Sequence, residues 1–135
     1  MTTVLFACVH NAGRSQMAAA FFNALADPQK ARAISAGTQP AAHVHPTVVE
    51  TMREVGIDLA DAVPQRLTAE LASGTRLLVT MGCAESCPVV PGSRLLDWPL
   101  RDPKDEPPEI VRQIRDEIRS KVGTLIAEEG WQKVD

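Results

Sequence analysis

The sequence predicts an α/β fold, a three-layer sandwich in which helices flank a four-stranded parallel sheet. Short apolar runs that are typical of buried strands alternate along the chain with segments of helical periodicity. Turn-forming residues separate these segments, and no internal repeat interrupts the alternation. A length of 135 residues suits one hydrophobic core, so we expect residues 1–135 to form a single domain.

Four apolar runs supply the predicted strands. Each run is short and is bounded by turn-forming residues; they cover residues 3–7, 31–37, 76–81 and 94–98. Helical segments between the strands favour parallel pairing, because a parallel pair needs a crossover connection. The loops that follow the strands should therefore gather at one edge of the sheet.

Four segments are predicted to be helical. Residues 16–25 are rich in good helix formers, and residues 109–128 carry an apolar stripe at helical spacing. A short helix at 67–71 has Thr68 as its N-cap. Another helix, with Pro46 in its first turn, has Gly56 as its predicted C-cap, and its apolar face consists of Val48, Val49, Met52 and Val55.

Composition and charge exclude several classes of function. The net charge is −3, from 14 basic and 17 acidic residues, and no basic cluster predicts binding to nucleic acid. No apolar run approaches the roughly 20 residues that cross a bilayer, and no basic segment of a signal peptide opens the chain. We therefore expect a cytoplasmic monomer without a membrane partner. In that compartment the three cysteines suggest catalysis or redox chemistry rather than structural disulfides.

The segment from Cys8 to Ser15 has the residues of an oxyanion-binding loop. It joins a predicted strand to a predicted helix, which is where α/β proteins place ligands. Backbone N–H groups of such a loop point inward, and the helix N-terminus adds positive potential that favours a thiolate at Cys8. Arg14 can offer two parallel hydrogen bonds to the anion, and Ser15 can donate to the sulfur. The remaining loop residues are Val9, His10, Asn11, Ala12 and Gly13.

A cysteine six residues before an arginine also arises by chance, and a lone buried cysteine is usually a small core residue. The strand before Cys8 and the helix after Ser15 favour the functional interpretation over chance. His10, within the loop, is interpreted as solvated or as hydrogen-bonded to the backbone.

Cys83 and Cys87 allow three interpretations. They could be half of a zinc site, but structural zinc needs four ligands and the histidines are not suitably placed. They could be two unrelated small residues. In the functional interpretation they form a relay, in which Cys83 attacks the sulfur of Cys8 and Cys87 then attacks Cys83 by thiol–disulfide exchange.

Asp102, followed by Pro103, lies in the loop after the last predicted strand. A carboxylic acid at the mouth of the anion loop could protonate a departing oxygen. An Asp-Pro pair is also a common plain turn, and the residues alone leave both interpretations open. Asp97 is nearby but falls inside a predicted strand, so we expect a structural role for it.

These motifs, in this order, resemble the arsenate reductases built on the low-molecular-weight tyrosine phosphatase fold. The resemblance covers nearly the whole chain and rests on Cys8 to Ala18, Ser35-Ala36-Gly37, Gly56-Ile57-Asp58, Met81-Gly82-Cys83, Cys87-Pro88 and Asp102-Pro103. It implies reduction of arsenate to arsenite, with Cys8 as nucleophile, Arg14 as anion clamp and Ser15 as thiolate support. It also implies Asp102 as general acid and Cys83 and Cys87 as the resolving pair.

The same resemblance implies an external reductant, either thioredoxin or a mycothiol–glutaredoxin system, with no bound cofactor or metal. The spacing of Cys83 and Cys87 is shorter than in the thioredoxin-coupled members, and resembles actinobacterial ones that use a low-molecular-weight thiol. Ala19 stands where some members carry an acidic residue for potassium, so we expect no potassium site.

Two alternatives remain for the function. A low-molecular-weight protein tyrosine phosphatase shares the loop and the Asp-Pro pair. However, it usually has proline where this chain has Gln16, and aromatic residues after the acid, whereas this chain has no tyrosine. A thiol redox sensor or anion-binding module without catalysis would also use the loop. The phosphatase interpretation leaves Cys83 and Cys87 without a function, and the sensor interpretation predicts reversible oxidation without formation of arsenite.

Overall fold

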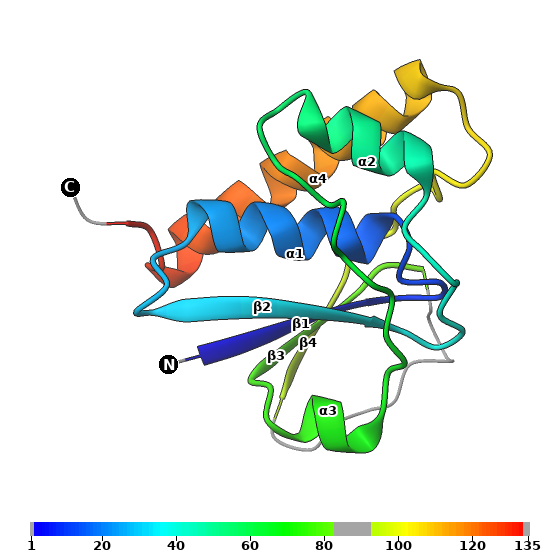
Figure 1. Cartoon of the computed structure of the whole chain (residues 1–135). Helices are drawn as coiled ribbons and strands as arrows, with labels where there is room; N and C mark the ends of the chain where they lie inside the picture. The colour runs from blue at the N-terminus through cyan, green and yellow to red at the C-terminus, as the bar shows by residue number, and fades with distance from the viewer. Residues whose placement is uncertain (1, 83–92, 134–135) are drawn as a thin grey trace.

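The computed structural model describes residues 2–82 and 93–133. Within these ranges the chain forms four strands and four helices (Figure 1). Their order is β1 (Thr2–Cys8), α1 (Arg14–Leu25), β2 (Ala31–Gly37), α2 (Pro46–Arg53), α3 (Ala69–Ser73), β3 (Leu77–Thr80), β4 (Arg94–Asp97) and α4 (Pro108–Glu129).

The strands form one parallel sheet in the order β2-β1-β3-β4, which confirms the predicted fold class. The register pairs Cys8 with Gly37 on one side of β1 and Ala7 with Thr80 on the other. The chain leaves β1 for β2 in one direction and then returns to β3 on the opposite side. Ligands of open α/β sheets bind at the carboxyl ends of the strands where the strand order reverses in this way.

Helices cover the two faces of the sheet unequally. Figure 1 shows α1, α2 and α4 on one face and the short α3 on the other. The larger core joins α1, α2 and α4 to the sheet. The smaller core, on the α3 side, consists of Leu5, Ala7, Ala36, Ala72 and Leu78. The structure is thus the predicted three-layer sandwich, with a thin layer on the α3 side.

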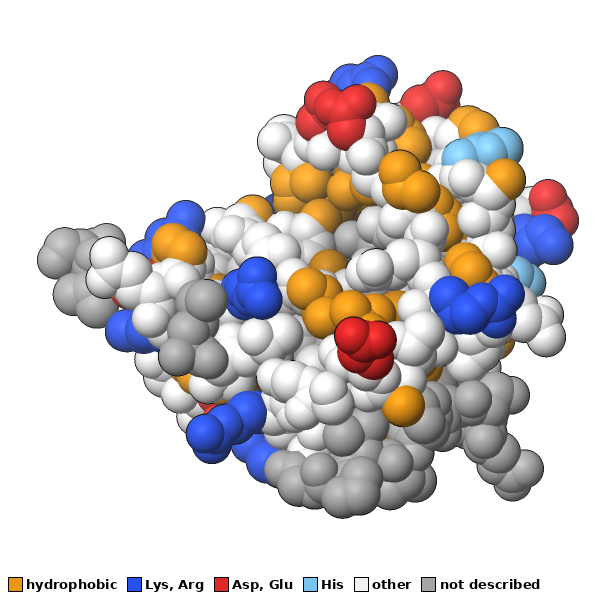
Figure 2. Space-filling model, turned by 60° about the horizontal axis from the view of Figure 1, so that its bottom comes forward, with side chains coloured by type: hydrophobic (Ala, Val, Ile, Leu, Met, Phe, Trp, Pro, Cys, Tyr) orange, Lys and Arg blue, Asp and Glu red, His pale blue; other side chains and the backbone are white. Residues whose placement is uncertain are grey.

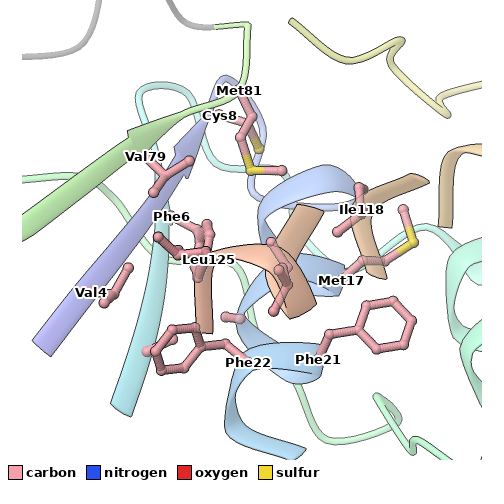
Figure 3. Close-up of a cluster of buried hydrophobic side chains, with 14 of the residues drawn as sticks. Val4, Phe6, Cys8, Met17, Phe21, Phe22, Val79, Met81, Ile118 and Leu125 are labelled. Carbon is pink, nitrogen blue, oxygen red and sulfur yellow. The ribbon is translucent and has the colours of Figure 1, made fainter. Parts of the chain in front are cut away.

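The alternation of side chains along β1 decides which way Cys8 points. Val4, Phe6 and Cys8 belong to the larger core, whereas Leu5 and Ala7 face the α3 side. Figure 3 shows the first set on the same side as Met17 and Phe22 of α1. Since successive residues of a strand face opposite sides, the position of Cys8 at the end of β1 directs its sulfur toward the beginning of α1.

The outer edge of β2 is covered by side-chain and loop hydrogen bonds. The Asn23 amide of α1 donates from Nδ2 to the Ala33 carbonyl (2.9 Å) and accepts from the Ala33 N–H at Oδ1 (2.8 Å). Further along, the Gly37 N–H donates to Gln65 and the Gly37 carbonyl accepts from Leu67. These bonds occupy polar groups that an edge strand would otherwise present to another chain.

On the α3 side, the charged side chains of the described residues are of both signs and do not form a patch of one sign. Figure 2 shows apolar side chains in a hollow of this face, with positive and negative side chains scattered around it. A cleft of about 500 Å³ on this side is lined by residues of the sheet and of the α3 region, among them Thr3, Arg32 and Glu70. In the described parts of the chain, no helix has the length and apolar character needed to span a membrane.

Candidate active site

Cys8 is the last residue of β1, and only 2% of its surface is exposed. Its Sγ lies 2.8 Å from the Oγ of Ser15 in the first turn of α1. The Nδ2 of Asn11 donates to the same Oγ at 2.7 Å. Because this bond occupies Ser15 Oγ as an acceptor, the single hydroxyl hydrogen of Ser15 is available to the sulfur, and a hydroxyl donor stabilises a thiolate.

The backbone between β1 and α1 turns its carbonyls outward. Every carbonyl from Cys8 to Gly13 accepts a hydrogen bond from outside the loop. The donors, in order along the loop, are the backbone N–H groups of Thr38 and Gln39, that of Ala41, the Gln16 Nε2, and the backbone N–H groups of His45 and Met17, at 2.7 to 3.2 Å.

The N–H groups of the same loop are left for a ligand. Over residues 2–82 and 93–133, no protein group accepts from the backbone N–H groups of residues 9–13. The N-cap of α1 is Gly13, which has no side chain to satisfy the first turn of the helix. Backbone N–H groups that converge at a helix N-terminus suit the binding of an anion, which is the ligand that the sequence led us to expect for this loop.

Asn11 holds this loop in shape. It is completely buried, and its φ of 50° is in the left-handed region that asparagine tolerates better than most residues. Its Oδ1 accepts from the Gln65 backbone N–H at 2.9 Å and from Gln16 Nε2 at 3.2 Å. The Asn11 side chain thus ties Ser15 to the segment that borders β2.

Arg14 lies beside the loop with 7% of its surface exposed. Its Nη1 donates to the Leu100 carbonyl at 3.1 Å, and its Nη2 lies 3.6 Å from Asp102 Oδ2. Gly82, two residues after the end of β3, leaves room for the guanidinium, since a Cβ at Gly82 would collide with it. These contacts fix the guanidinium next to the anion loop.

Asp102 is both a turn residue and a neighbour of Arg14. Its Oδ1 accepts from the Lys104 backbone N–H at 3.0 Å, which is the plain Asp-Pro turn considered above. Its Oδ2 faces Arg14 and is accessible, since 41% of the side chain is exposed. Pro103 packs on the anion loop, so that a Cβ on Gly13 would lie 2.6 Å from its Cγ.

His45 is a site neighbour that the sequence did not indicate. It is the N-cap of α2, and its backbone N–H donates to the Ala12 carbonyl at 3.0 Å. Partial burial lowers its pKa from the usual value of 6.5, and the nearby Asp102 carboxylate opposes that shift. The one local signal was the His45-Pro46 pair, since proline favours the first turn of a helix.

The structure brings together most of the residues predicted for the site. Cys8, the loop 9–13, Arg14, Ser15 and Asp102 meet at the carboxyl edge of β1 and β3. Cys83 and Cys87 lie outside the described residues. Among the described side chains, no group of three or more His, Cys, Asp or Glu residues is arranged to hold a metal ion.

Comparisons with known proteins agree with this arrangement. A protein of Halobacterium salinarum, provisionally named arsenate reductase, is 37% identical over 131 residues, which cover 91% of this chain and 89% of that protein. The glutaredoxin arsenate reductase of Synechocystis is 32% identical over 130 residues. The match covers 94% of this chain and 98% of that protein.

Among solved structures, the thioredoxin-dependent arsenate reductase of Corynebacterium glutamicum superposes with a TM-score of 0.83 at 38% identity. The match covers 95% of this chain, which spans 61% of the length of that protein. A family model described as "Low molecular weight phosphotyrosine protein phosphatase" matches residues 3–134. This chain therefore belongs to the low molecular weight phosphotyrosine protein phosphatase family.

Proposed function

We propose that this chain is an enzyme that reduces arsenate to arsenite. The observation that carries the proposal is the position of Cys8 Sγ, 2.8 Å from Ser15 Oγ beneath a loop whose carbonyls all point away. This geometry suits a tetrahedral oxyanion held by backbone N–H groups directly over a sulfur nucleophile. The arsenate reductase names of relatives that span most of this chain support arsenate as the anion.

In the first step, the thiolate of Cys8 attacks arsenic, and a sulfur–arsenic bond forms as one arsenate oxygen leaves as water. Arg14 holds the remaining oxygens, and Ser15 stabilises the thiolate before the attack. Asp102 supplies the proton to the departing oxygen. The accessible Oδ2 of Asp102, 3.6 Å from Arg14 Nη2, supports this role.

In the second step, the thiolate of Cys83 attacks the sulfur of Cys8. A Cys8–Cys83 disulfide forms, the electron pair of the sulfur–arsenic bond stays on arsenic, and arsenite leaves with two more electrons than arsenate had. Cys87 then attacks Cys83, which releases Cys8 and leaves a Cys83–Cys87 disulfide. The sequence pattern Cys83-x-x-x-Cys87 supports these two steps.

An external thiol reductant then reduces the Cys83–Cys87 disulfide and completes the cycle. Relatives named as thioredoxin-dependent and as a glutaredoxin arsenate reductase support a reductant of this class. Thioredoxin and a mycothiol–glutaredoxin system are the two donors we propose. Both need a compartment that keeps thiols reduced, so we place the enzyme in the cytoplasm.

The proposal is tested by an NADPH-coupled arsenate assay that is run in parallel with thioredoxin and with mycothiol–glutaredoxin components. Arsenite should form with one of the two donors. The Cys8→Ser variant should lose roughly three orders of magnitude or more in kcat, because serine is a far weaker nucleophile. Arsenite production by Cys8→Ser at the wild-type rate would overturn the mechanism.

The relay is tested separately by single-turnover measurements. Cys87→Ser should release one equivalent of arsenite and accumulate a Cys8–Cys83 disulfide, which mass spectrometry of peptides detects. Further turnover of this variant should stop when thioredoxin is the donor. Continued multiple turnover of Cys87→Ser with thioredoxin would show that Cys87 is not a resolving cysteine.

A protein tyrosine phosphatase is the second candidate, and the match to a phosphotyrosine phosphatase family model over residues 3–134 favours it. Hydrolysis of p-nitrophenyl phosphate does not discriminate, because the anion loop alone could support it. A kcat/KM for a phosphotyrosine peptide far above that for arsenate would favour the phosphatase. We expect the opposite order.

A further inference from the structure

His45 contacts the outside of the anion loop at two points. Its backbone N–H donates to the Ala12 carbonyl at 3.0 Å. Its ring lies beside Gly13, where an added Cβ would be 3.6 Å from His45 Cδ2 and 2.6 Å from Pro103 Cγ. The imidazole therefore lies against the same backbone whose N–H groups face the anion.

Several charged groups from different elements face this imidazole. Asp102 and Asp105, from the loop before α4, favour the protonated form, whereas Lys104 from that loop and His10 from the anion loop disfavour it. Burial is the largest influence, and it lowers the pKa of His45. The ring is thus neutral near pH 7 while the loop is empty. The carboxylates of Asp102 and Asp105 lie close enough to favour its protonated form when further negative charge arrives.

We propose that His45 takes up a proton when a dianionic oxyanion fills the loop, which makes it a charge-matching residue that favours the dianion. The inference rests on the proposed role of residues 9–13 as the oxyanion site. A dianion on one side of Ala12 and Gly13 adds negative potential on the other side, where the half-buried imidazole lies. The imidazolium that forms offsets charge that Arg14 alone leaves uncompensated.

Proton uptake by His45 makes the affinity for the anion depend on pH. Affinity for a ligand that is dianionic at every pH should rise as pH falls from 8 to 6, because proton uptake and anion binding assist each other. Without His45, affinity for such a ligand should depend far less on pH over that range.

Sulfate is the probe, since it remains a dianion throughout this range. The Cys8→Ser protein is the background, because the thiol of Cys8 would otherwise exchange its own proton when the anion binds. Calorimetry in buffers of different ionisation enthalpy measures both the affinity and the protons taken up. We expect net uptake near pH 7 and affinity about threefold or more higher at pH 6 than at pH 8.

A matched control assigns the effect, because the chain has only three histidines. In the Cys8→Ser background, His45→Gln should abolish most of the uptake and flatten the pH dependence, whereas exposed His43→Gln should change neither. Uptake that persists with His45→Gln would overturn the assignment.

NMR titration of the imidazole Cε1–H signals keeps the inference testable even if His45→Gln does not fold. Saturating sulfate should raise the pKa of His45, and an unchanged titration curve would overturn the proposal. The two hypotheses fail differently. Absence of any sulfate binding would contradict the oxyanion site itself, whereas binding without proton uptake would contradict only the role of His45.

Discussion

At the scale of single residues, the candidate site combines side chains that are close together in the sequence with others that come from distant segments. Cys8, Arg14 and Ser15 were predictable because their spacing is local and lies between a recognisable strand and helix. Gln65 and Leu100 were not predictable, because Gln65 is 54 positions from its partner Asn11 and Leu100 is 86 positions from its partner Arg14. Contacts of that kind depend on how the strands and loops are arranged in space, and no local pattern in one sequence reveals that arrangement.

Gly82 illustrates such a contact and gives a test. It has a φ of 94°, and a Cβ there would meet the Arg14 guanidinium. Gly82→Ala should displace Arg14 from the Leu100 carbonyl and lower kcat/KM for arsenate by roughly tenfold or more, as misplaced clamps do. Steady-state kinetics measures the change.

Gly130→Ala is the matched control for backbone strain. Gly130 has a φ of 74° with nothing within 4 Å of the added Cβ, so alanine there should cost about 1 kcal/mol of stability without loss of activity. Equal losses of activity in the two variants would mean that strain, rather than the collision with Arg14, explains Gly82→Ala.

At the scale of elements, local rules worked where the determinants are local. Thr68 caps α3 by accepting from the Leu71 N–H at 3.0 Å, as predicted. The prediction that Gly56 is the C-cap of α2 was wrong, because the helix ends at Arg53 with Glu54 as its C-cap, and Gly56 forms the turn that follows with a φ of 82°. The predicted start of α1 at residue 16 was wrong by two positions, because the helix begins at Arg14, inside the anion loop. Hydrophobic periodicity could not locate that start, because the first residues of the helix are the polar Arg14, Ser15 and Gln16.

The edge of β2 shows an element that depends on one side chain. Asn23→Ala removes both hydrogen bonds to Ala33 and should lower the free energy of unfolding by about 1–2 kcal/mol. Alanine is the better helix former, so the loss arises despite a gain in helix propensity. Urea denaturation followed by circular dichroism measures the change.

Gln113→Ala serves as the control, because Gln113 is an exposed position of α4 where alanine also raises helix propensity, though by less than at Asn23. It should be neutral or slightly stabilising. If Asn23→Ala is equally neutral, the amide of Asn23 does not stabilise β2.

At the scale of the whole molecule, the α2 and α4 helices are joined by charges that the sequence did not reveal. Glu54, just after α2, accepts from Arg112 Nη2 at 2.8 Å and from Arg115 Nη1 at 2.9 Å. Arg115 also donates to the Thr51 carbonyl at 2.8 Å. The apolar stripe of α4 predicted that the helix packs on the core, but the partner of its polar face depends on where α2 lies.

This ion-pair cluster makes a prediction about stability and pH. Hydrogen bonds from Arg112, and secondarily from Arg115, lower the pKa of Glu54 from 4.5 to about 2. Because the pKa is lower in the folded state than in the unfolded state, the stabilisation is complete above pH 4.5 and is lost as pH falls toward 2. The stability difference between the wild-type protein and Glu54→Gln should therefore shrink over that range.

Thermal unfolding between pH 2.5 and pH 6 measures this difference, and Glu50→Gln is the matched control on the exposed surface of α2. Glu50 has no ion-pair partner among the described residues, so its variant should follow the wild-type curve. Added salt should reduce the Glu54 effect, because the pair is only partly shielded from solvent. Parallel stability curves for Glu54→Gln and the wild-type protein would mean that the cluster does not hold α2 to α4. The position of His45, the N-cap of α2, would then not depend on this cluster.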